Sequence, residues 1–447
     1  MGGNNMGLEN KSFRKFTDEV CSQVKCAEMH EDIKEELNCH LQELEEEYIA
    51  QGSTCEEASK LAVAHMGDSE KIGFDLNKIY QRRPDYKTLF ICSIFIAIGL
   101  LVQFSIYKNA PKIISYNDYM KMIILTILGG ILGVVVYFLD YRKLEKYSWQ
   151  LFIAATILIG LIIFFGKYVN GNRNIIFLGT AFDLSTIASV LYIISLCGLI
   201  TKVYHSKYGI LKLLLMICFS GYSILLTNQE VSFVIYCVLI VGLLMYSGIP
   251  KKLILLMLAL GTFSICTFIF SATYRFHRFI SIFIFARKGD MNMDYVVGKI
   301  QLLLSNSKFI GNGISKEVIS TTPLINVNFI FTYIIYSFGW IVGITILIMI
   351  TLLLFNLFKT SKNIKNSYGK LLFKSITLAL TIQFLLPIMS NLNLISSLYI
   401  SMPFIGYNGS SVIMNMVLIG LICGIYGRKN LSKSLASSSS SIVTQPE

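Results

Sequence analysis

Six carboxylates in this chain are placed where they could do acid–base chemistry, because each lies in or beside a connection on the same side of a series of apolar segments. An ionised carboxylate can take a proton from a hydroxyl and so act as a general base. Each could equally be a helix cap or a solvated loop residue. A carboxylate held within a membrane is usually retained for function, which draws attention to Glu230. The six are Asp118, Asp183, Glu230, Asp290, Asp294 and Glu317.

Four basic residues on the same side could bind an anion. A guanidinium group matches phosphate oxygens with two parallel hydrogen bonds, and an ammonium group attracts the same charge. Arg173, Arg275, Arg278 and Lys299 are therefore candidates for binding a phosphate-bearing ligand. The alternative is that they meet the anionic headgroups of a membrane surface.

A third candidate feature is the stretch "PFIGYNGSS", residues 403–411, between the last two apolar runs. Small residues let helix backbones approach closely, and hydroxyl groups can hydrogen-bond between helices in lipid. Tyr407, Ser410 and Ser411 are the polar members that could contact a ligand.

Metal and disulfide chemistry are not indicated. Cys26, His30, Cys39 and His40 fit no standard zinc spacing. All ten cysteines fall in the polar N-terminal part or inside apolar runs, so no disulfide framework is expected. The rows of Ile, Leu and Phe predict lipid-facing or core surfaces, and no cofactor is expected.

The elements that must position these residues are membrane-spanning helices. The 447 residues are 54% hydrophobic and 15% charged, where a soluble protein carries about 25% charge. Runs of about 20 apolar residues can cross a bilayer. Ten such runs predict an all-α polytopic membrane protein: 88–107, 120–139, 148–166, 181–200, 209–227, 230–248, 252–271, 326–357, 370–388 and 404–427. The 326–357 run is long enough to be tilted or to lie partly outside the bilayer.

Charge sets the expected orientation. Short cytoplasmic loops are rich in Lys and Arg, and alternate loops here carry such residues, as in Arg142, Lys143 and Lys146. The short links at 228–229 and 389–403 have none. We therefore expect both termini in the cytoplasm, and a long basic outer loop over 272–325.

The first 87 residues predict a small, acidic, cytoplasmic helical domain, with 17 acidic and 10 basic residues up to Arg83. Ile33, Leu37, Leu41, Leu44 and Tyr48 share one helical stripe that Gly52 closes. A capping box from Ser53 to Glu56 is expected to open the next helix, which ends at Gly67. The order of residues over 36–68 resembles the permease prefix domain found ahead of various bacterial membrane proteins, which implies a partner-binding or regulatory role. The serine-rich tail, 431–447, is expected to be disordered.

The segment 403–428 resembles the last signature of the SEDS family (shape, elongation, division and sporulation; FtsW/RodA/SpoVE type), roughly P-F-[IV]-S-Y-G-G-S-S and a final span. Gly406 and Asn408 replace a Ser and a Gly. Further segments resemble the family's motifs in the same order, so that the resemblance covers about 88–430. They are 137–152 (D-Y-R-x-L), 170–179 (G-A-x-R-W-I-x-L-G), 182–189 (Q-P-S-E-x-x-K), 227–235 (Q-P-D-L-G-T), 274–279 (Y-R-x-x-R), 307–315 (G-x-G) and 325–343 (H-T-D-F-I-F, then G-E-E-x-G-x-x-G).

The departures from the family pattern fall on its polar positions. The Asp of H-T-D-F-I-F, the family's presumed catalytic base, is replaced by Asn328. An amide cannot act as a base near neutral pH. If catalysis persists, the fallback bases are Glu317, eleven residues earlier, and Glu230, at the Asp position of Q-P-D. The other replaced positions are Ile175, Thr186, Ser189, Tyr336 and Ser337.

Two functions stay open. The resemblance implies a peptidoglycan glycosyltransferase that polymerises glycan from lipid II, an undecaprenyl-diphosphate disaccharide, usually with a penicillin-binding transpeptidase, in cell elongation, division or sporulation. The lost Asp favours a non-enzymatic relative that binds lipid II as a scaffold or regulator. A transporter is less favoured, because no paired intramembrane charges are evident. No nucleic-acid partner is expected.

Overall fold

The computed structural model describes residues 11–25, 30–80, 84–169, 172–177, 180–204, 206, 208–227, 229–270, 273, 295–395, 400–406 and 408–429. The chain forms two compact units, Asp85–Ile425 and a second one that contains Met1–Pro84 and Tyr426–Glu447. The tail over 431–447 lies outside the described residues.

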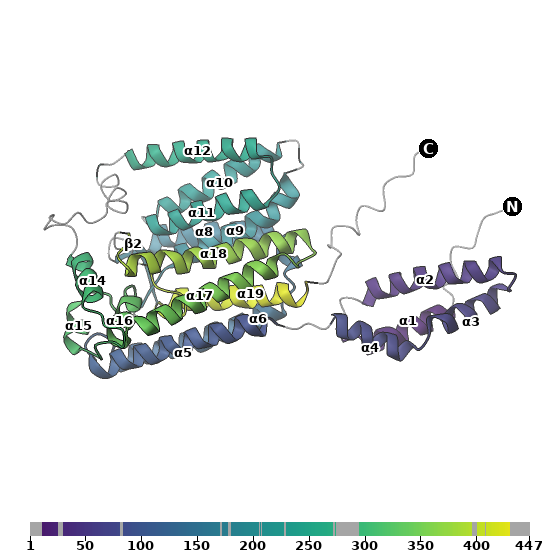
Figure 1. The fold of residues 1–447 in the computed structure, drawn as a ribbon. Helices are drawn as coiled ribbons and strands as arrows, with labels where there is room; N and C mark the ends of the chain where they lie inside the picture. The colour runs from purple at the N-terminus through teal and green to yellow at the C-terminus, as the bar shows by residue number, and fades with distance from the viewer. Residues whose placement is uncertain are drawn as a thin grey trace. The chain divides into compact units, whose positions relative to one another are not determined.

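The first 84 residues contain four helices (Figure 1): α1 (Lys11–Gln23), α2 (His30–Ala50), α3 (Cys55–Met66) and α4 (Ser69–Tyr80). The predicted stripe is confirmed for Ile33, Leu37 and Leu41, which are buried in one cluster with Phe16 and Val20 of α1, and for Leu44, which packs at its edge. Tyr48, the fifth predicted residue, is not part of this cluster, and its hydroxyl lies 2.9 Å from His65 Nδ1. The four helices thus enclose a core of their own.

The predicted capping box is displaced by one residue. Thr54, not Ser53, caps α3, and the Glu57 carboxylate accepts hydrogen bonds from the Thr54 N–H (3.4 Å) and hydroxyl (2.8 Å). The reason is that Ser53 still belongs to the end of α2: its N–H donates to the Tyr48 carbonyl at 3.1 Å, beyond a Gly52 with φ 98°. Gly67 ends α3 with φ 90°, as predicted.

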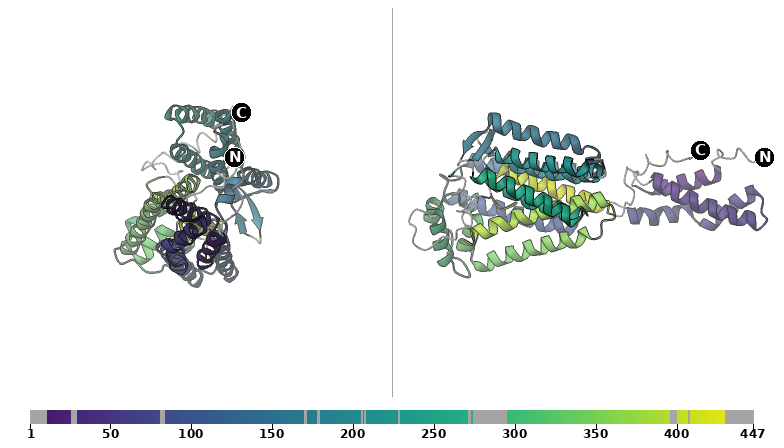
Figure 2. Two further views of the ribbon diagram at one scale, coloured as in Figure 1. Left: turned by 90° about the vertical axis from the view of Figure 1, so that its right-hand side faces the viewer. Right: turned by 90° about the horizontal axis from the view of Figure 1, so that it is seen from above.

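The Asp85–Ile425 unit is a bundle of long helices that lie side by side (Figures 1 and 2). Its long helices are α5 (Tyr86–Asn109), α6 (Tyr116–Phe138), α8 (Ser148–Phe165), α9 (Leu184–Val203), α10 (Gly209–Leu225), α11 (Glu230–Tyr246), α12 (Lys251–Phe270), α17 (Trp340–Ser361), α18 (Ser367–Asn391) and α19 (Gly409–Gly427). The short ones are α7 (Arg142–Lys146), α14 (Tyr295–Ser305), α15 (Lys316–Thr321) and α16 (Ile330–Phe338).

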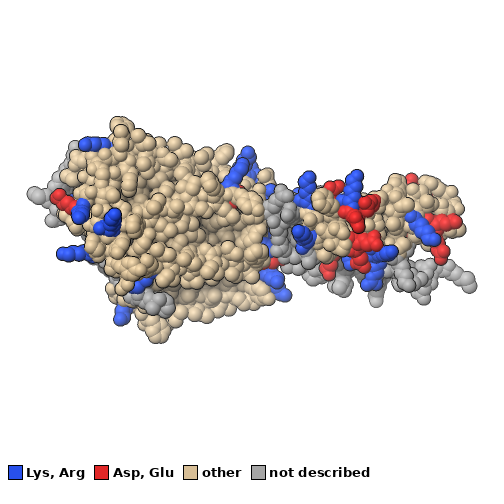
Figure 3. Space-filling view, turned by 90° about the horizontal axis from the view of Figure 1, so that it is seen from below, with Lys and Arg blue, Asp and Glu red and all other residues tan. Residues whose placement is uncertain are grey.

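Seven of the described helices are long and apolar enough to cross a membrane: α5, α6, α8, α9, α17, α18 and α19. Helices α10 and α11 are shorter apolar helices, and α12 occupies the predicted 252–271 run. The predicted all-α polytopic membrane fold is confirmed, whereas the count of ten spans stays a prediction. On the face that Figure 3 shows, Lys and Arg lie at both ends of this unit and the length between is free of charged side chains.

The predicted 326–357 run is not one helix. Gly339, with φ 96°, separates α16 from α17. A Cβ atom at Gly339 would lie 2.1 Å from the Phe309 carbonyl oxygen, so no other residue fits there without a shift of the backbone. The first part of the run is therefore a short helix that precedes the span.

Small residues bring α6 and α19 into backbone contact. A Cβ atom on Gly420 would lie 2.1 Å from the Gly133 carbonyl oxygen, and one on Gly133 would lie 2.8 Å from that of Met416. Helices α9 and α18 pack against each other near the centre, which agrees with their high proportion of buried residues.

Three short antiparallel strands, which the sequence pattern did not predict, connect α8 to α9 in the order β1 (Lys167–Val169), β2 (Asn172–Phe177) and β3 (Thr180–Phe182). Tyr168 pairs with Arg173, and Ile176 pairs with Ala181. Figure 1 shows β2, α14, α15 and α16 at one end of the bundle, which we call the loop end. The chain reaches α9, α11 and α19 from this end.

Candidate functional site

Asn328 lies in a tight turn just before α16. Leu324 has φ 51°, and its carbonyl accepts hydrogen bonds from the N–H groups of Val327 (3.1 Å) and Asn328 (2.9 Å). Asn328 is buried, with 6% of the residue exposed. Its side chain is an amide, which cannot remove a proton.

Asn391, at the end of α18, fixes this turn. Its Nδ2 donates to the carbonyl oxygens of Asn328 and Pro387, both at 2.8 Å. Its Oδ1 accepts from the Thr332 N–H (3.0 Å) and hydroxyl (3.2 Å). Because Asn391 is fully buried, the bonds hold the start of α16 and the end of α18 in one arrangement.

The 403–406 part of the small-residue stretch packs against the same turn. A Cβ atom on Gly406 would lie 2.7 Å from the Val327 carbonyl oxygen, and one on Gly99 of α5 would lie 2.6 Å from that of Phe404. Phe404 is buried and has φ 63°, an unusual value for a residue with a side chain. The backbone of this segment is thus wedged between α5 and the Asn328 turn.

Gln103 of α5 supports the turn from another side. Its Nε2 donates to the Asn326 carbonyl oxygen at 2.6 Å, and the whole side chain is buried. The turn is therefore held by two buried amides, Gln103 and Asn391, which come from helices far apart in the sequence.

Ser410 joins the small-residue stretch to the start of α9. Its Oγ accepts from the Asp183 N–H at 3.2 Å and donates to Asn408 Oδ1 at 2.8 Å. Asp183 is the N-cap of α9: its carboxylate accepts from the Ser185 hydroxyl (2.8 Å) and the Thr186 hydroxyl (2.6 Å). The negative charge that a helix start favours is thus already supplied by Asp183.

The start of α11 continues this polar network. Ser232 Oγ lies 3.0 Å from the hydroxyls of both Ser185 and Thr186, and Gln229 Oε1 accepts from Ser185. Gln229 Nε2 donates to the Arg173 carbonyl oxygen at 2.8 Å. Four segments singled out in the sequence, 170–179, 182–189, 227–235 and 403–411, therefore meet at the loop end.

Arg173 lies on β2 with part of its guanidinium already engaged. Its Nε donates to the Tyr168 hydroxyl at 2.9 Å, and its Nη1 donates to the Ile163 carbonyl oxygen at 3.0 Å. The guanidinium carbon lies 5.0 Å from the centre of the Tyr168 ring. These contacts hold the guanidinium on the strand, half-exposed at the loop end.

The 307–315 segment docks on the end of α16 through its backbone. The N–H groups of Asn312 and Gly313 donate to the carbonyl oxygens of Tyr336 (2.9 Å) and Ser337 (3.1 Å). Gly311 has φ 96°, and a Cβ atom there would lie 2.4 Å from the Ser337 carbonyl oxygen. Tyr336 and Ser337, which the sequence pattern predicts in place of family carboxylates, thus contribute backbone oxygens to this contact.

Two further predicted residues lie in the helices beside this segment. Lys299 is half-buried on α14, with its Nζ 5.7 Å from the centre of the Tyr295 ring. Glu317 is exposed in the first turn of α15, where its negative charge interacts favourably with the helix dipole.

Several predicted residues fall where the structure makes no statement. Arg275, Arg278, Tyr407, Asp290 and Asp294 lie outside the described residues. Glu230 is the first residue of α11, and its side chain is likewise not described. Ser411 is half-buried, and its Oγ accepts from Asn415 Nδ2 at 3.2 Å.

The remaining predicted carboxylate at this end, Asp118, belongs to the capping box at the start of α6, whose N-cap is Ser115. Asp118 accepts from the Ser115 hydroxyl at 2.7 Å and from its N–H at 3.3 Å, and it lies 3.6 Å from Lys121. Among the described residues no cluster of His, Cys, Asp or Glu could hold a metal ion. The described polar groups of the loop end are therefore amides, hydroxyls, basic groups and carboxylates at helix starts.

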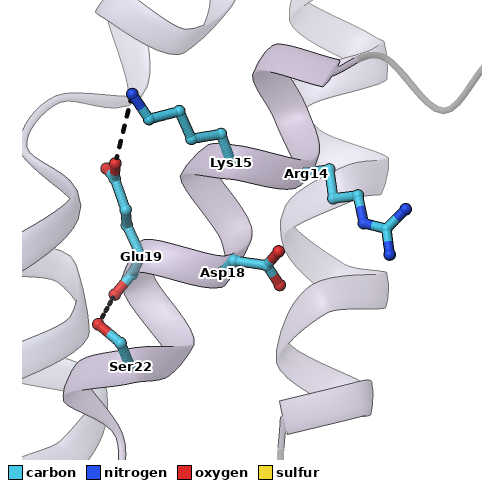
Figure 4. A pocket seen from close by; sticks show the side chains of 5 residues that line it. All are labelled: Arg14, Lys15, Asp18, Glu19 and Ser22. Atoms are coloured by element: carbon cyan, nitrogen blue, oxygen red, sulfur yellow. Dashed lines mark hydrogen bonds and ion pairs between the residues drawn. The ribbon is translucent and has the colours of Figure 1, made fainter.

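A shallow hollow on α1 is an alternative site, and Figure 4 shows that two of its residues, Lys15 and Ser22, contact a third, Glu19. Lys15 Nζ lies 4.0 Å from a Glu19 carboxylate oxygen, and the Ser22 hydroxyl donates to the Glu19 carbonyl at 2.6 Å. Asp18 pairs with Lys34 of α2. This surface thus offers no evident site for a ligand.

Sequence reasoning missed Asn391, Gln103 and Gln229. Each is an amide in or beside an apolar helix, and a buried polar side chain of this kind needs a hydrogen-bond partner. That requirement is a signal that the sequence carries, although it does not say which partner each amide finds.

Comparison with known proteins shows which family the chain matches. The family model for FtsW, RodA and SpoVE, described as "Cell cycle protein", matches residues 86–430. The probable peptidoglycan glycosyltransferase FtsW of Hydrogenovibrio crunogenus is 23% identical over 358 residues, which cover 76% of this chain and 91% of that protein. The protein of the same name from Coxiella burnetii is 24% identical over 356 residues, 75% of this chain and 94% of that protein.

Solved structures share the fold. A chain from a peptidoglycan synthase complex, described as coordinating polymerization and crosslinking, matches with a TM-score of 0.62 and 18% identity over 78% of this chain and 99% of that one. The rod shape determining protein RodA of Thermus thermophilus matches with a TM-score of 0.55 and 16% identity over 78% and 98%. The chain belongs to the FtsW/RodA/SpoVE family of cell cycle proteins, the SEDS family.

Proposed function

We propose that this protein is a component of peptidoglycan synthesis in the bacterial cytoplasmic membrane and that it binds lipid II at the loop end. The observation that carries the proposal is the meeting of the Asn328 turn with the 403–406 segment, through Gly406 and Val327. Relatives that this chain matches over most of their length are named as probable peptidoglycan glycosyltransferases, which supports the substrate class.

The diphosphate of lipid II would be held by basic groups. Arg173 is anchored at the loop end by Tyr168 and Ile163, and Lys299 lies on α14. Arg275 and Arg278 complete the set that the sequence predicts. A guanidinium can bond two oxygens of one phosphate, whereas a lysine acts as a point charge. Tyr407, Ser410 and Ser411 would contact the sugar or its phosphate.

Grooves between the helices would hold the polyprenyl tail. One of them is a cavity of about 150 Å³ between α10, α11 and α12, lined by residues such as Leu214, Phe233 and Ile240. Its walls are largely apolar, which suits a hydrocarbon chain.

Glycan polymerisation is the first candidate activity, and lipid II binding without catalysis is the second. One observation favours the second. Asn328 is an amide, Asp183 is the N-cap of α9, Asp118 belongs to the capping box of α6, and Glu317 is exposed. If the protein polymerises glycan, its general base would be Glu230 or Glu317. If it does not, it acts as a scaffold or regulator for other enzymes.

The proposal includes a partner and an orientation. A penicillin-binding transpeptidase is the expected partner, in keeping with the match to a chain of a synthase complex. The Lys/Arg distribution of the loops favours both termini in the cytoplasm. The acidic helical domain before the bundle would then contact a cytoplasmic regulator.

The test is to incubate the purified full-length protein, in nanodiscs, with fluorescent lipid II. Binding is measured directly, and glycan strands are sought on a gel, with and without a candidate transpeptidase. We expect saturable binding and few or no strands. Binding no stronger than that of the polyprenol without its diphosphate would overturn the proposal, and abundant strands would replace the scaffold function by the polymerase.

A further inference from the structure

Phe309 and Ile310 are two large apolar side chains that the fold leaves uncovered outside any helix. Phe309 is 74% exposed and Ile310 is 85% exposed. They lie in the connection between α14 and α15, where an exposed apolar pair in water would be unfavourable. Exposed apolar surface of this kind marks a contact with a membrane or another molecule.

The backbone beneath this pair is ordered by hydrogen bonds on both sides. The N–H groups of Trp340 and Ile341 donate to the carbonyl oxygens of Lys308 (3.2 Å) and Phe309 (3.3 Å). On the other side of the pair, the N–H groups of Asn312 and Gly313 bond the end of α16. The pair is therefore presented by a fixed loop and not by a loose linker.

These bonds also place the pair beside the start of a membrane span. Helix α17, which begins at Trp340, is long and apolar enough to cross a bilayer. Its exposed residues Ile341 (56%), Ile344 (47%) and Ile348 (55%) follow one face from the first turn onward. Because the Phe309 carbonyl bonds the Ile341 N–H, Phe309 lies level with the first turn of this lipid-facing stripe.

The residues around the pair have the composition of a membrane interface. Trp340 begins the span, and tryptophan is enriched at the boundary between lipid and water. Lys308 precedes the pair and Lys316 follows it, both exposed. Lysines beside an apolar tip can reach acidic headgroups while the tip enters the apolar layer. Figure 3 shows Lys and Arg side chains at this end of the bundle.

We propose that Phe309 and Ile310 insert into the interfacial layer of the bilayer beside α17, with Lys308 and Lys316 against acidic lipid headgroups. This contact anchors the loop that closes on the end of α16, and so holds the neighbouring Asn328 turn at a fixed depth. The inference does not depend on peptidoglycan synthesis, since it applies equally to a polymerase and to a scaffold.

The test uses tryptophan as a depth probe in the full-length protein in nanodiscs. Both native tryptophans are first replaced (Trp149→Phe and Trp340→Phe), and Phe309→Trp or Ile310→Trp is added. The matched control is Ser320→Trp, at an exposed polar position on α15. We expect brominated lipids to remove most of the emission of a tryptophan at 309 or 310, iodide to have little effect on it, and the control to show the reverse.

Emission at 309 and 310 that iodide quenches and brominated lipids do not would overturn the proposal, because the pair would face water. Protection from both quenchers would overturn it too, because protein would cover the pair. Equal quenching in neutral and acidic bilayers would overturn the proposed contact of Lys308 and Lys316 with acidic lipid headgroups.

A second measurement leaves both native tryptophans in place. A photoreactive benzoyl-phenylalanine at position 309 of the otherwise unchanged chain should crosslink to lipid. Crosslinks to a second protein, or to another part of this chain, would count against the membrane contact.

Discussion

The side-chain amide of Asn391 donates a hydrogen bond to the backbone carbonyl oxygen of Asn328 across 2.8 Å. This bond joins the end of α18 to the turn before α16. It therefore sets the position of Asn328, the residue that the sequence pattern predicts in place of a family carboxylate. Both residues are buried, and water cannot replace the bond at little cost.

Replacing Asn391 by Ala should destabilise the bundle. The change leaves the Asn328 carbonyl and the Thr332 N–H without their partner, and a buried unsatisfied group costs about 1–3 kcal/mol. Thermal unfolding in detergent or nanodiscs measures the effect. Asn363→Ala, at an exposed asparagine, is the matched control and should leave the transition unchanged. An equal stability of both variants would contradict the role given to Asn391.

Asn328→Asp should raise polymerase turnover if the rest of the pocket is intact. The change restores a carboxylate of nearly the same shape, and general-base assistance typically contributes about 10²–10⁴-fold. Turnover of labelled lipid II is the measurement. No gain would mean that other replaced positions matter as much, which favours the scaffold.

A wild-type protein that already polymerises lipid II rapidly would require another base. Glu317→Gln and Glu230→Gln then test the two fallback carboxylates, and each should lower turnover if it serves. A rapid enzyme that neither change affects would show that the base lies elsewhere.

The double variant Arg275→Ala/Arg278→Ala should bind a lipid-linked diphosphate at least about tenfold more weakly, since each charge-assisted hydrogen bond contributes about 1.5–3 kcal/mol. These residues lie outside the described part of the chain, so this prediction rests on the sequence. Titration of nanodisc-embedded protein with fluorescent lipid II measures the affinity. Lys359→Ala/Lys362→Ala, at the other end of α17, controls for the loss of two positive charges, and an equal loss there would refute the specific role.

Acid should loosen the contact between α1 and α2. The hydrogen bond from Lys34 lowers the pKa of Asp18, and the same bond raises the pKa of Lys34. A lowered carboxyl pKa contributes stability above its unfolded value of about 3.9, and this contribution is lost as the pH falls through the folded value. The raised lysine pKa contributes below about 10.4 and is lost as the pH rises through its folded value.

Hydrogen exchange of the α1 and α2 amides in the full-length protein, followed from neutral pH into acid, measures this contact. In the wild type, the protection of these amides, relative to their intrinsic exchange rate at each pH, should fall in acid. Asp18→Asn should remove this acid-dependent loss of protection. If the variant and the wild type keep the same pH dependence, the pair contributes nothing. Ser22→Ala, on the same helix, is a control without a charge change.

Orientation can be tested by cysteine labelling in a background without native cysteines. Asp290→Cys, in the predicted outer loop, should react with an impermeant reagent added from outside, and Lys362→Cys only after the membrane is opened. Labelling of position 290 from the inside alone would contradict the expected topology.

The sequence by itself determined the helical membrane fold, the positions of most long helices and the family. These follow from local properties: apolar runs of bilayer length, loop charges and short motifs in order. The core stripe of α2 was predicted for the same reason, since Ile33, Leu37 and Leu41 recur at the helical period. The predicted start of the next helix, α3, is wrong by one residue, because the Ser53 N–H still donates to the Tyr48 carbonyl of α2.

Only the tertiary structure decided which distant segments form the site. The division of the 326–357 run at Gly339 depends on the approach of the Phe309 carbonyl, and the support of Asn328 depends on Gln103 and Asn391. A sequence shows that a buried amide needs partners, but not which ones, because the partner is chosen by the packing of whole helices. The contact of Gly406 with the Asn328 turn arises in the same way, from backbones that meet only when the bundle is assembled.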